Sequence, residues 1–314
     1  MGWKAGLTVS DARSPDKVRW PGNASCAVSV VVDLSVPGGE DGIRSIDLET
    51  ERARYGLDVA LPRILDLLDR YGVRATFPVP GLIALEEPDC VRRVVDAGHE
   101  IACHGLLHED VFDLPIEQEA KRMDRALTAL SDLSGKSPAG WFSMARQTDR
   151  YPGGSVSPNT IELLIDRGMM YFGNSQADDV PHYWIVRPSP LKALLALPYS
   201  YFCDDQFFID FPPGPRWLSG TNTERVSTLE SNWNEELDAM LGSDSFPGYG
   251  RTVTVVIHPY LSGWGQRLLA LDRFLERISG EKAIWIPTST ELATYWSGEF
   301  PLSDLAVPVS DWRS

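Results

Sequence analysis

Runs of consecutive apolar residues alternate along this chain with longer segments in which apolar residues recur every three or four positions. The clearest run extends from Cys26 to Val32, is interrupted only by Ser29, and stops at Asp33. A short continuous apolar run is typical of a strand buried on both faces, whereas the three-to-four spacing is typical of a helix. Strands that alternate with helices in this way predict an α/β fold with a parallel sheet.

The expected elements follow one another through most of the chain. Strands are expected at residues 26–32, 73–79, 100–103, 140–143, 170–172, 194–199, 252–257 and 283–286. Helices are expected at residues 59–71, 88–97, 116–133, 160–167, 224–241, 268–278 and 289–296, with long loops at 37–55 and 212–222. We therefore expect a distorted (β/α) barrel of about seven parallel strands, related to the TIM barrel. No glycine-rich phosphate loop follows the first strand, so nucleotide binding is not indicated.

The composition of the chain limits the classes of partner that we expect it to bind. The chain has 314 residues, a formal net charge of −15 and four scattered cysteines. An acidic surface repels phosphate backbones and anionic lipids, so we expect neither nucleic acid nor a membrane surface as a partner. The cysteines form no CxxC pair and are expected to be free thiols. With no apolar signal segment after Met1 and no run of 18 apolar residues, a cytoplasmic protein is expected.

Four chemically capable side chains fall at or near the ends of expected strands, namely Asp33, His104, Arg146 and His258. In barrels of parallel strands the chemistry lies at the C-terminal ends, so these residues are expected to meet at one rim. A single aspartate or histidine after a strand is more commonly structural. Four such residues at one rim favour a functional site.

His104 and His108 are four residues apart, which suits one metal ion if the turn between them is helical. A zinc-like ion with two histidine ligands takes a carboxylate as a third ligand, for which Asp33 is the candidate, and water as a fourth. Ion-bound water is a nucleophile at neutral pH. Amide hydrolysis also needs a base and an acid, and Asp33 and His258 are candidates for that pair.

Several short segments, taken together, resemble a known family. They are a strand ending in Asp33, then YGVRATFPV (71–79), AGHEI (97–101), HGLLHE (104–109) and IHP (257–259). This set resembles the polysaccharide deacetylase (NodB-homology, carbohydrate esterase 4-like) family. Within it, the chain looks closest to a subgroup of peptidoglycan-deacetylase-like proteins, cyclic imide hydrolases and a metal-independent allantoinase. The resemblance covers about residues 25–297.

The resemblance implies a distorted (β/α) barrel that hydrolyses a non-peptide C–N bond. By position, it implies that Asp33 is the catalytic base, His258 the general acid, and His104 and His108 the metal ligands. It also places Asp205, in the pair Asp204-Asp205, near the substrate.

The chain departs from the family pattern at two places. The family's metal-binding aspartate follows the base by one or two residues, where this chain has Leu34 and Ser35. Either Asp33 itself then binds the metal, or the ion is held weakly, or no metal is needed. The arginine that the family has after the fourth strand is replaced by Phe142, and Arg146 is the candidate substitute.

We therefore expect a hydrolase that acts on a small amide, imide or N-acetyl substrate. A divalent metal, expected to be zinc, would be held by His104, His108 and Asp33, with Arg146 among the catalytic residues. Trp141 and Asp205 are expected to contact the substrate. The alternatives are a sugar or peptidoglycan N-deacetylase and a non-catalytic carbohydrate-binding relative.

Three expectations concern organisation. Residues 1–24 are expected to form an N-terminal arm, 25–297 the catalytic barrel and 298–314 a C-terminal tail. The family resemblance implies a homo-oligomer. His99 is expected to be structural, and His182, placed in a polar loop, is given no role.

Overall fold

The strands form one curved sheet. The computed structural model describes residues 18–39, 41–146, 154–188, 190–210, 222–242 and 252–304. The strand order is β6-β7-β5-β4-β3-β2-β1-β8, and β9 pairs with β1. The strands are β1 (Cys26–Val32), β2 (Thr76–Val79), β3 (Glu100–Cys103), β4 (Gly140–Trp141), β5 (Tyr171–Ser175), β6 (His182–Pro188), β7 (Leu191–Pro198), β8 (Thr252–Ile257) and β9 (Ile284–Trp285).

Every neighbouring pair from β7 round to β8 is parallel, which confirms the expected α/β sheet of about seven parallel strands. Between β7 and β8 the described residues form no continuous ladder. Instead, the hydroxyl of Thr254 donates to the carbonyl of Pro198 at 2.8 Å, and Asp204 forms a single bridge with Val256. The barrel is therefore distorted and open on this side.

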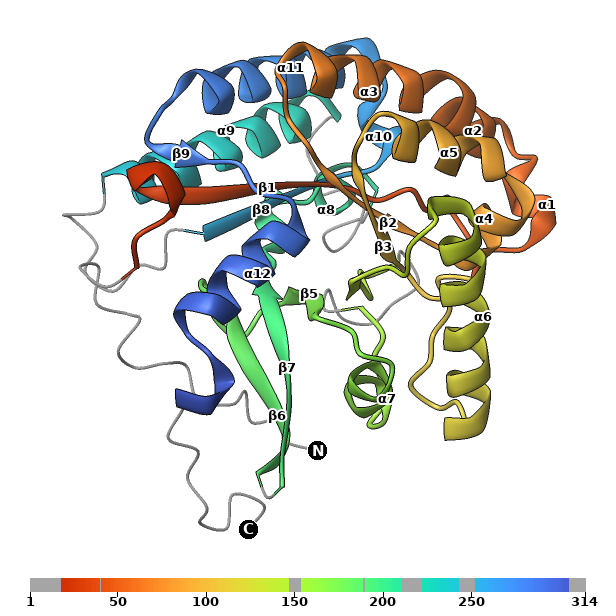
Figure 1. The fold of residues 1–314 in the computed structure, drawn as a ribbon. Coiled ribbons are helices and arrows are strands. Elements are labelled where there is room, and N and C mark those ends of the chain that lie inside the picture. Colours follow the sequence, from red (N-terminus) through yellow and green to blue (C-terminus); the bar gives the residue numbers. More distant parts are fainter. Residues whose placement is uncertain are drawn as a thin grey trace.

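Helices cover the outer face of the sheet, where α3, α11 and α9 pack beside one another (Figure 1). The helices are α1 (Ser45–Leu48), α2 (Glu51–Arg54), α3 (Leu61–Arg70), α4 (Gly81–Glu86), α5 (Pro88–Asp96), α6 (Ile116–Ser134), α7 (Thr160–Asp166), α8 (Asp205–Ile209), α9 (Asn222–Leu241), α10 (Pro259–Ser262), α11 (Gly265–Gly280) and α12 (Ser289–Glu299). Within the described ranges, no helix combines the length and the apolar character needed to cross a bilayer.

Three local expectations were wrong. The segment 37–55 is not one long loop, because α1 and α2 occupy its second half and a π-helical segment, Tyr55–Ala60, leads into α3. Strand β6 was missed, and it pairs antiparallel with β7. The segment around His182 is therefore strand rather than polar loop. The expected loop at 212–222 lies almost wholly outside the described residues.

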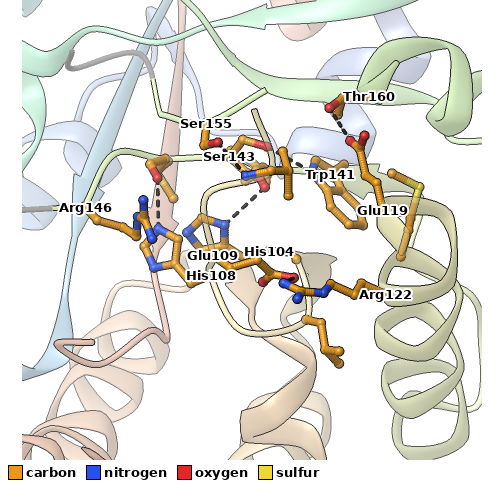
Figure 2. Close-up of a pocket in the computed structure, with 16 residues that line it drawn as sticks. His104, His108, Glu109, Glu119, Arg122, Trp141, Ser143, Arg146, Ser155 and Thr160 are labelled. Atoms are coloured by element: carbon orange, nitrogen blue, oxygen red, sulfur yellow. Dashed lines mark hydrogen bonds and ion pairs between the residues drawn. The ribbon is translucent and has the colours of Figure 1, made fainter. Parts of the chain in front are cut away.

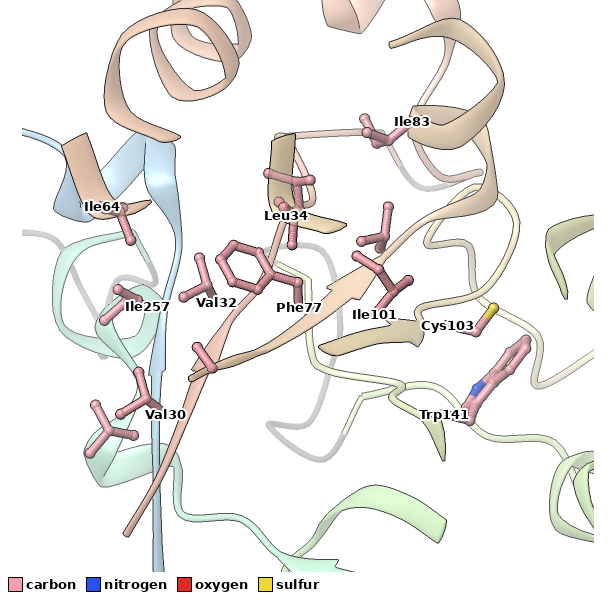
Figure 3. Packing of buried hydrophobic residues seen from close by; sticks show 14 of the residues in the cluster. Val30, Val32, Leu34, Ile64, Phe77, Ile83, Ile101, Cys103, Trp141 and Ile257 are labelled. Carbon is pink, nitrogen blue, oxygen red and sulfur yellow. The ribbon is translucent and has the colours of Figure 1, made fainter. Parts of the chain in front are cut away.

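Successive side chains along the buried strands point alternately into two separate hydrophobic layers. On β1, Val28, Val30 and Val32 pack outward against the helices, where Figure 3 shows Val30 and Val32 among the side chains of neighbouring elements. The intervening Ala27 and Val31 belong to a second cluster inside the barrel. Because side chains alternate in a strand, the residue that follows β1 at the inward position is Asp33. The same alternation of inward and outward side chains applies to the other strands that carry residues of the site.

Both ends of the described chain pack on the barrel. Trp20 is buried, and its ring centroid lies 6.0 Å from that of Trp296 on α12 and 5.9 Å from that of Trp285 on β9. Tyr183 on β6 donates its hydroxyl proton to the carbonyl of Phe300 at 3.2 Å. The expected division into arm, barrel and tail stays a prediction. All four cysteines are buried and free, as expected.

Candidate active site

Three strands each place one polar residue at the inward position just past their C-terminal ends. On β3, Ile101 and Cys103 face the outer layer and Ala102 faces the barrel interior, so His104 faces inward. On β8, Val255 and Ile257 face outward and Val256 inward, so His258 also faces inward. With Asp33 from β1, these residues are three of the four that were expected to meet at the C-terminal rim.

Backbone hydrogen bonds continue past the strand ends and fix these positions. The amide of Asp33 donates to the carbonyl of Ile257 at 2.9 Å, and the amide of His104 donates to the carbonyl of Val79 at 3.0 Å. The parallel ladders therefore hold the Cα atoms of the site as firmly as those of the strands. The site is part of the rigid scaffold.

The two imidazoles converge on one carboxylate oxygen. Nε2 of His104 lies 3.2 Å from Oδ2 of Asp33, and Nε2 of His258 lies 3.1 Å from the same oxygen. All three side chains are buried, and none of these three atoms has a hydrogen bond of good geometry. The other oxygen, Oδ1, accepts the amide proton of Ser35 at 2.8 Å. Oδ2 is thus the oxygen available for chemistry.

The opposite nitrogens of the two rings have fixed partners. Nδ1 of His104 donates to the carbonyl of Phe142 at 3.1 Å, since a carbonyl can only accept. Nδ1 of His258 donates to Oδ1 of Asp205 at 2.7 Å. Oδ2 of Asp205 accepts from the amide of His258 at 2.9 Å and from the hydroxyl of Ser262 at 2.5 Å. Asp205 is therefore buried behind His258 and orients its ring, rather than lying against the substrate as expected.

The surroundings of this cluster favour a negatively charged Asp33 and a positively charged His258. Burial raises the pKa of Asp33, but the charges of His104 and His258 and their contacts outweigh burial and hold the pKa well below its usual value. Burial lowers the pKa of His258, but the carboxylates of Asp205 and Asp33 outweigh it and raise the pKa well above its usual value. At neutral pH the site thus holds an Asp33 carboxylate against a His258 imidazolium. Desolvation and Asp205 raise the pKa of Asp204 to about 6, against the opposing charge of His258.

His108 does not share a helical turn with His104. The segment between them is a bend, and His108 has a left-handed backbone with φ of 53°. Its Nε2 donates to the carbonyl of Met144 at 2.9 Å, and its ring lies beside that of His104 at 4.0 Å between centroids. Desolvation and the neighbouring His104 lower the pKa of His108 to about 3, so it is neutral.

The residues present do not fit the expected zinc site. Among the described residues, only Asp204, Asp205 and His258 offer ligand atoms that all lie within 4.8 Å of one another. Those atoms are hydrogen-bonded to each other and to protein donors, with 2.7 Å between His258 Nδ1 and Asp205 Oδ1. The expected set lacks a second carboxylate at Ser35, and the hydrogen bond to Met144 engages one nitrogen of His108. No step of the chemistry is derived through a metal.

A pocket lies next to the cluster. Roughly 330 Å³ of space free of protein atoms lies within it, with open solvent at its mouth included. Its polar lining consists of Ser35, His108, Arg146, Gln206 and Tyr260. Three of these residues neighbour the cluster in sequence: Ser35 follows Asp33 by two, Gln206 follows Asp205, and Tyr260 follows His258 by two.

A second hollow is lined by His104 and His108 together with Trp141 and Glu119 (Figure 2). Trp141 lines this hollow, and its indole N–H donates to the hydroxyl of Ser143 at 3.0 Å. Glu119 accepts hydroxyl protons from Ser157 and Thr160 at 2.5 Å each. These polar groups are engaged with each other, which favours a structural role for this hollow.

The structure places the remaining expected residues as follows. Arg146 lines both pockets and lies 3.8 Å from the carboxylate of Asp110. Nδ1 of His99 accepts the amide proton of Ala75 at 3.2 Å, in line with a structural role. His182 is buried on β6 and contacts the hydroxyl of Ser175 at 3.0 Å.

Sequence reasoning missed Tyr260 and Gln206 as pocket residues. Each stands within two positions of a residue that it did identify, and that spacing was the available signal. Gln206 and Tyr260 are the second residues of the short helices α8 and α10, which turn both side chains towards the pocket.

The chain is similar to several known proteins and, in part, to one protein family. Residues 55–172 match the family described as polysaccharide deacetylase. The peptidoglycan deacetylase of Helicobacter pylori is 25% identical over 82% of this chain and 88% of its own length. The putative polysaccharide deacetylase of Schizosaccharomyces pombe is 23% identical, over 94% of this chain and 97% of its own.

Two solved structures cover most of the chain. A Mycobacterium smegmatis protein described as "putative polysaccharide deacetylase" is 28% identical, with a TM-score of 0.73 over 90% of this chain and 94% of that one. The allantoinase PuuE is 24% identical, with a TM-score of 0.74 over 92% of this chain and 94% of that one.

Fold and rim cluster together define a NodB-type (β/α) barrel. Residues 55–172 of the chain resemble a polysaccharide deacetylase domain, and the two relatives that cover most of the chain are named as deacetylases. Deacetylases of this family are generally metal-dependent, so the absence of the expected zinc ligand set among the described residues distinguishes this site.

Proposed function

We propose that this protein hydrolyses a non-peptide C–N bond in a small amide or imide. One observation carries the proposal: Asp33 Oδ2 is held between Nε2 of His104 and Nε2 of His258, at 3.2 Å and 3.1 Å. A carboxylate and an imidazolium that lie next to each other supply the base and the acid that amide hydrolysis needs. The pocket beside them, whose polar lining includes Ser35, Arg146 and Gln206, offers a place for the substrate.

The proposed reaction uses the side chains of this chain alone. Asp33 accepts a proton from water while the water oxygen bonds to the carbonyl carbon. His258 donates its Nε2 proton to the amide nitrogen, and the C–N bond breaks to release an amine and an acid. The proton on Asp33 then returns to His258 across their 3.1 Å contact, which restores the starting state.

The other residues of the cluster would act by positioning. Asp205 orients His258 through Nδ1 and favours its protonated form. His104, fixed by the Phe142 carbonyl, would hold the attacking water on the far side of Asp33. Phe142 occupies the position of the family arginine and contributes only its backbone there.

A sugar N-deacetylase is the second candidate, because the relative from Helicobacter pylori is named a peptidoglycan deacetylase. The two are separated by assaying acetate release from N-acetylglucosamine oligomers beside ring opening of succinimide. We expect ring opening to be the faster reaction. Glycan binding without turnover of any amide would instead indicate a non-catalytic carbohydrate-binding protein.

The mechanism is tested by Asp33→Asn. Loss of the base is expected to lower kcat by about 10³-fold, within the range that general bases contribute. The exposed Asp66 provides a matched control, and Asp66→Asn is expected to leave kcat unchanged. Full activity in Asp33→Asn would refute the mechanism, whatever the substrate.

Metal dependence is tested separately. Because the expected ligands are not assembled, dialysis against a chelator is expected to remove no ion needed for turnover. Elemental analysis of the purified protein and rates before and after chelation give the readout. Loss of activity on chelation with recovery on added zinc would show that Asp33 and His104 serve a metal. The expected homo-oligomer and cytoplasmic location stay predictions.

A further inference from the structure

We propose that Arg52 is a positioning residue of the active site, because it joins the two short helices that carry the general acid and its partner. The inference rests on the proposed hydrolase function and adds a residue to it. His258 stands just before α10, and Asp205, which orients it, is the first residue of α8. Arg52, on α2, contacts Tyr260 on α10 and Asp210 directly after α8.

The segment that follows Arg52 is packed tightly on α10. A Cβ atom at Gly56 would lie 2.9 Å from that of Tyr260. A Cβ atom at Gly263 would lie 2.0 Å from that of Ala60, so the two backbones approach this closely only because both positions are glycine. The hydroxyl of Tyr55 also donates to the carbonyl of Gly263 at 2.8 Å. The π-helical segment after α2 is therefore fixed against α10 and gives Arg52 a rigid base.

The guanidinium of Arg52 lies over the ring of Tyr260. Arg52 precedes Gly56 by four residues, and this spacing puts both on the helix face that meets α10. The Cζ atom of Arg52 is 4.8 Å from the ring centroid, within the range of a cation–π contact. The same ring meets the imidazole of His258 edge to face, with 5.7 Å between centroids. Arg52 thus supports the aromatic side chain that packs against the acid.

Asp210 depends on Arg52 for the neutralisation of its charge. Its Oδ1 lies 2.5 Å from Nη2 of Arg52, and its side chain is only 9% exposed. Its Oδ2 is buried, and no residue in the described parts of the chain donates to that oxygen. The backbone amide of Asp210 donates to the carbonyl of Gln206 at 2.9 Å, which ties the carboxylate to α8. A buried carboxylate that loses its cation is strongly destabilised, so without Arg52 this end of α8 would move towards water.

Such a movement would reach the acid, because α8 is only five residues long. Asp205 at its start accepts from Nδ1 of His258 at 2.7 Å and from the hydroxyl of Ser262 at 2.5 Å. A displaced α8 therefore alters the hydrogen bond that orients the imidazolium. Misplacement of a reacting group by about 1 Å can cost about 10²-fold in rate. Arg52 itself does not line the pocket, so its removal is expected to act on kcat rather than on substrate binding.

The experiment compares Arg52→Met with Arg54→Met on the amide that the wild type hydrolyses, succinimide or N-acetylglucosamine oligomers. Arg54 lies on the same helix but pairs with Asp58 and Glu87 rather than with α8 or α10, so it controls for damage to α2. We expect Arg52→Met to lower kcat by at least about tenfold with little change in KM. Arg54→Met should match the wild type. Arg52→Lys, which can still pair with Asp210, should be intermediate.

Two further measurements separate positioning from a general loss of structure. The Arg52 side chain is 43% exposed, so the space left by Arg52→Ala is open to solvent. Millimolar guanidinium is expected to restore part of the lost kcat, whereas sodium chloride at the same concentration is not. Asp210→Asn should also lower kcat, and combining it with Arg52→Met should cost no more than Arg52→Met alone, since the pair acts as one unit.

The outcomes separate this inference from the function on which it rests. Wild-type turnover with an unchanged kcat in Arg52→Met would overturn the role of Arg52 and leave the hydrolase standing. An equal loss of kcat in Arg54→Met, or no recovery with guanidinium, would assign Arg52 a merely structural role and overturn the proposal too. If Arg52→Met does not fold, a wild-type kcat in Asp210→Asn would contradict the proposal. No turnover of any amide by the wild type would overturn both.

Discussion

Asp33 is a buried carboxylate whose ionisation depends on its two imidazole neighbours. His258 is in turn kept protonated by Asp205, with which it shares two hydrogen bonds, at 2.7 Å and 2.9 Å. The chain Asp33–His258–Asp205 therefore behaves as one electrostatic unit, in which a change at either carboxylate alters the charge of the imidazole.

We predict that this unit makes stability depend on pH. The pKa of His258 is raised above its ordinary 6.5 on folding, so the folded state binds more protons than the unfolded state above pH 6.5. Its stabilisation is complete below pH 6.5 and is lost as pH rises towards the folded pKa. Urea unfolding from pH 6.5 to 8.5 should show a falling free energy.

Asp205→Asn should make that decline shallower, because the carboxylate that chiefly raises the pKa of His258 is removed. Asp66→Asn, at an exposed position, should leave the slope unchanged. An identical slope in the wild type and in Asp205→Asn would contradict the assignment. The comparison of variants cancels the titration of groups outside this cluster, which they share.

At the scale of elements, the strands carry different chemistry at their two ends. The C-terminal ends hold the Asp33 cluster, whereas Glu100 at the start of β3 ties the strands to α12. Its carboxylate accepts from the hydroxyls of Tyr171 at 2.6 Å, Thr76 at 2.9 Å and Thr290 at 2.5 Å, and from the amide of Thr290 at 2.9 Å. This end of the barrel is therefore structural.

We predict that Glu100→Ala destabilises the protein without altering catalysis. Several buried donors lose their acceptor, and the expected loss is about 3 kcal/mol in the free energy of unfolding. Denaturant unfolding gives the loss, and kcat measured well below the transition should match the wild type. The free energy of unfolding of Glu100→Gln, which keeps one acceptor oxygen, should lie between those of the wild type and Glu100→Ala. A fall in kcat with unchanged stability would place Glu100 in the site instead.

At the scale of the whole molecule, aromatic packing joins distant parts of the chain. Trp20, before the first strand, packs against Trp285, Tyr295 and Trp296 from the last strand and helix, with ring centroids 5.7 to 6.0 Å apart. Two clusters of buried side chains, inside and outside the sheet, make up the rest of the core. The two ends of the described chain are thereby part of one packed body.

We predict that Trp20→Ala lowers the free energy of unfolding by about 3–5 kcal/mol, the usual cost of truncating a buried aromatic residue. The Phe112 side chain is 60% exposed, and Phe112→Ala should change stability by no more than about 0.5 kcal/mol. Urea unfolding of both variants provides the comparison. A Trp20→Ala variant as stable as the wild type would mean that the segment before β1 is dispensable.

Much of the fold could be predicted from local patterns. The continuous apolar run 26–32 and the run 252–257 became β1 and β8 with the expected bounds. Strand β6 was missed because its sequence, HYWIVRP, begins with a histidine and ends with a proline, and its pairing with β7 depends on a non-local partner. The helix expected at residues 59–71 begins within a π-helical segment, Tyr55–Ala60, and α3 itself begins only at Leu61.

For the site, the sequence by itself determined which residues stand at the strand ends, because a buried strand stops where its apolar run stops. Asp33, His104 and His258 follow from that rule and from the order of the elements. Only the tertiary structure decided what these residues do to each other. Hydrogen bonds to the carbonyls of Phe142 and Met144 orient the two imidazoles of the 104–108 segment differently. These partners are more than thirty positions away in sequence. Side-chain direction in a packed site is set by such contacts, which spacing along the chain does not encode.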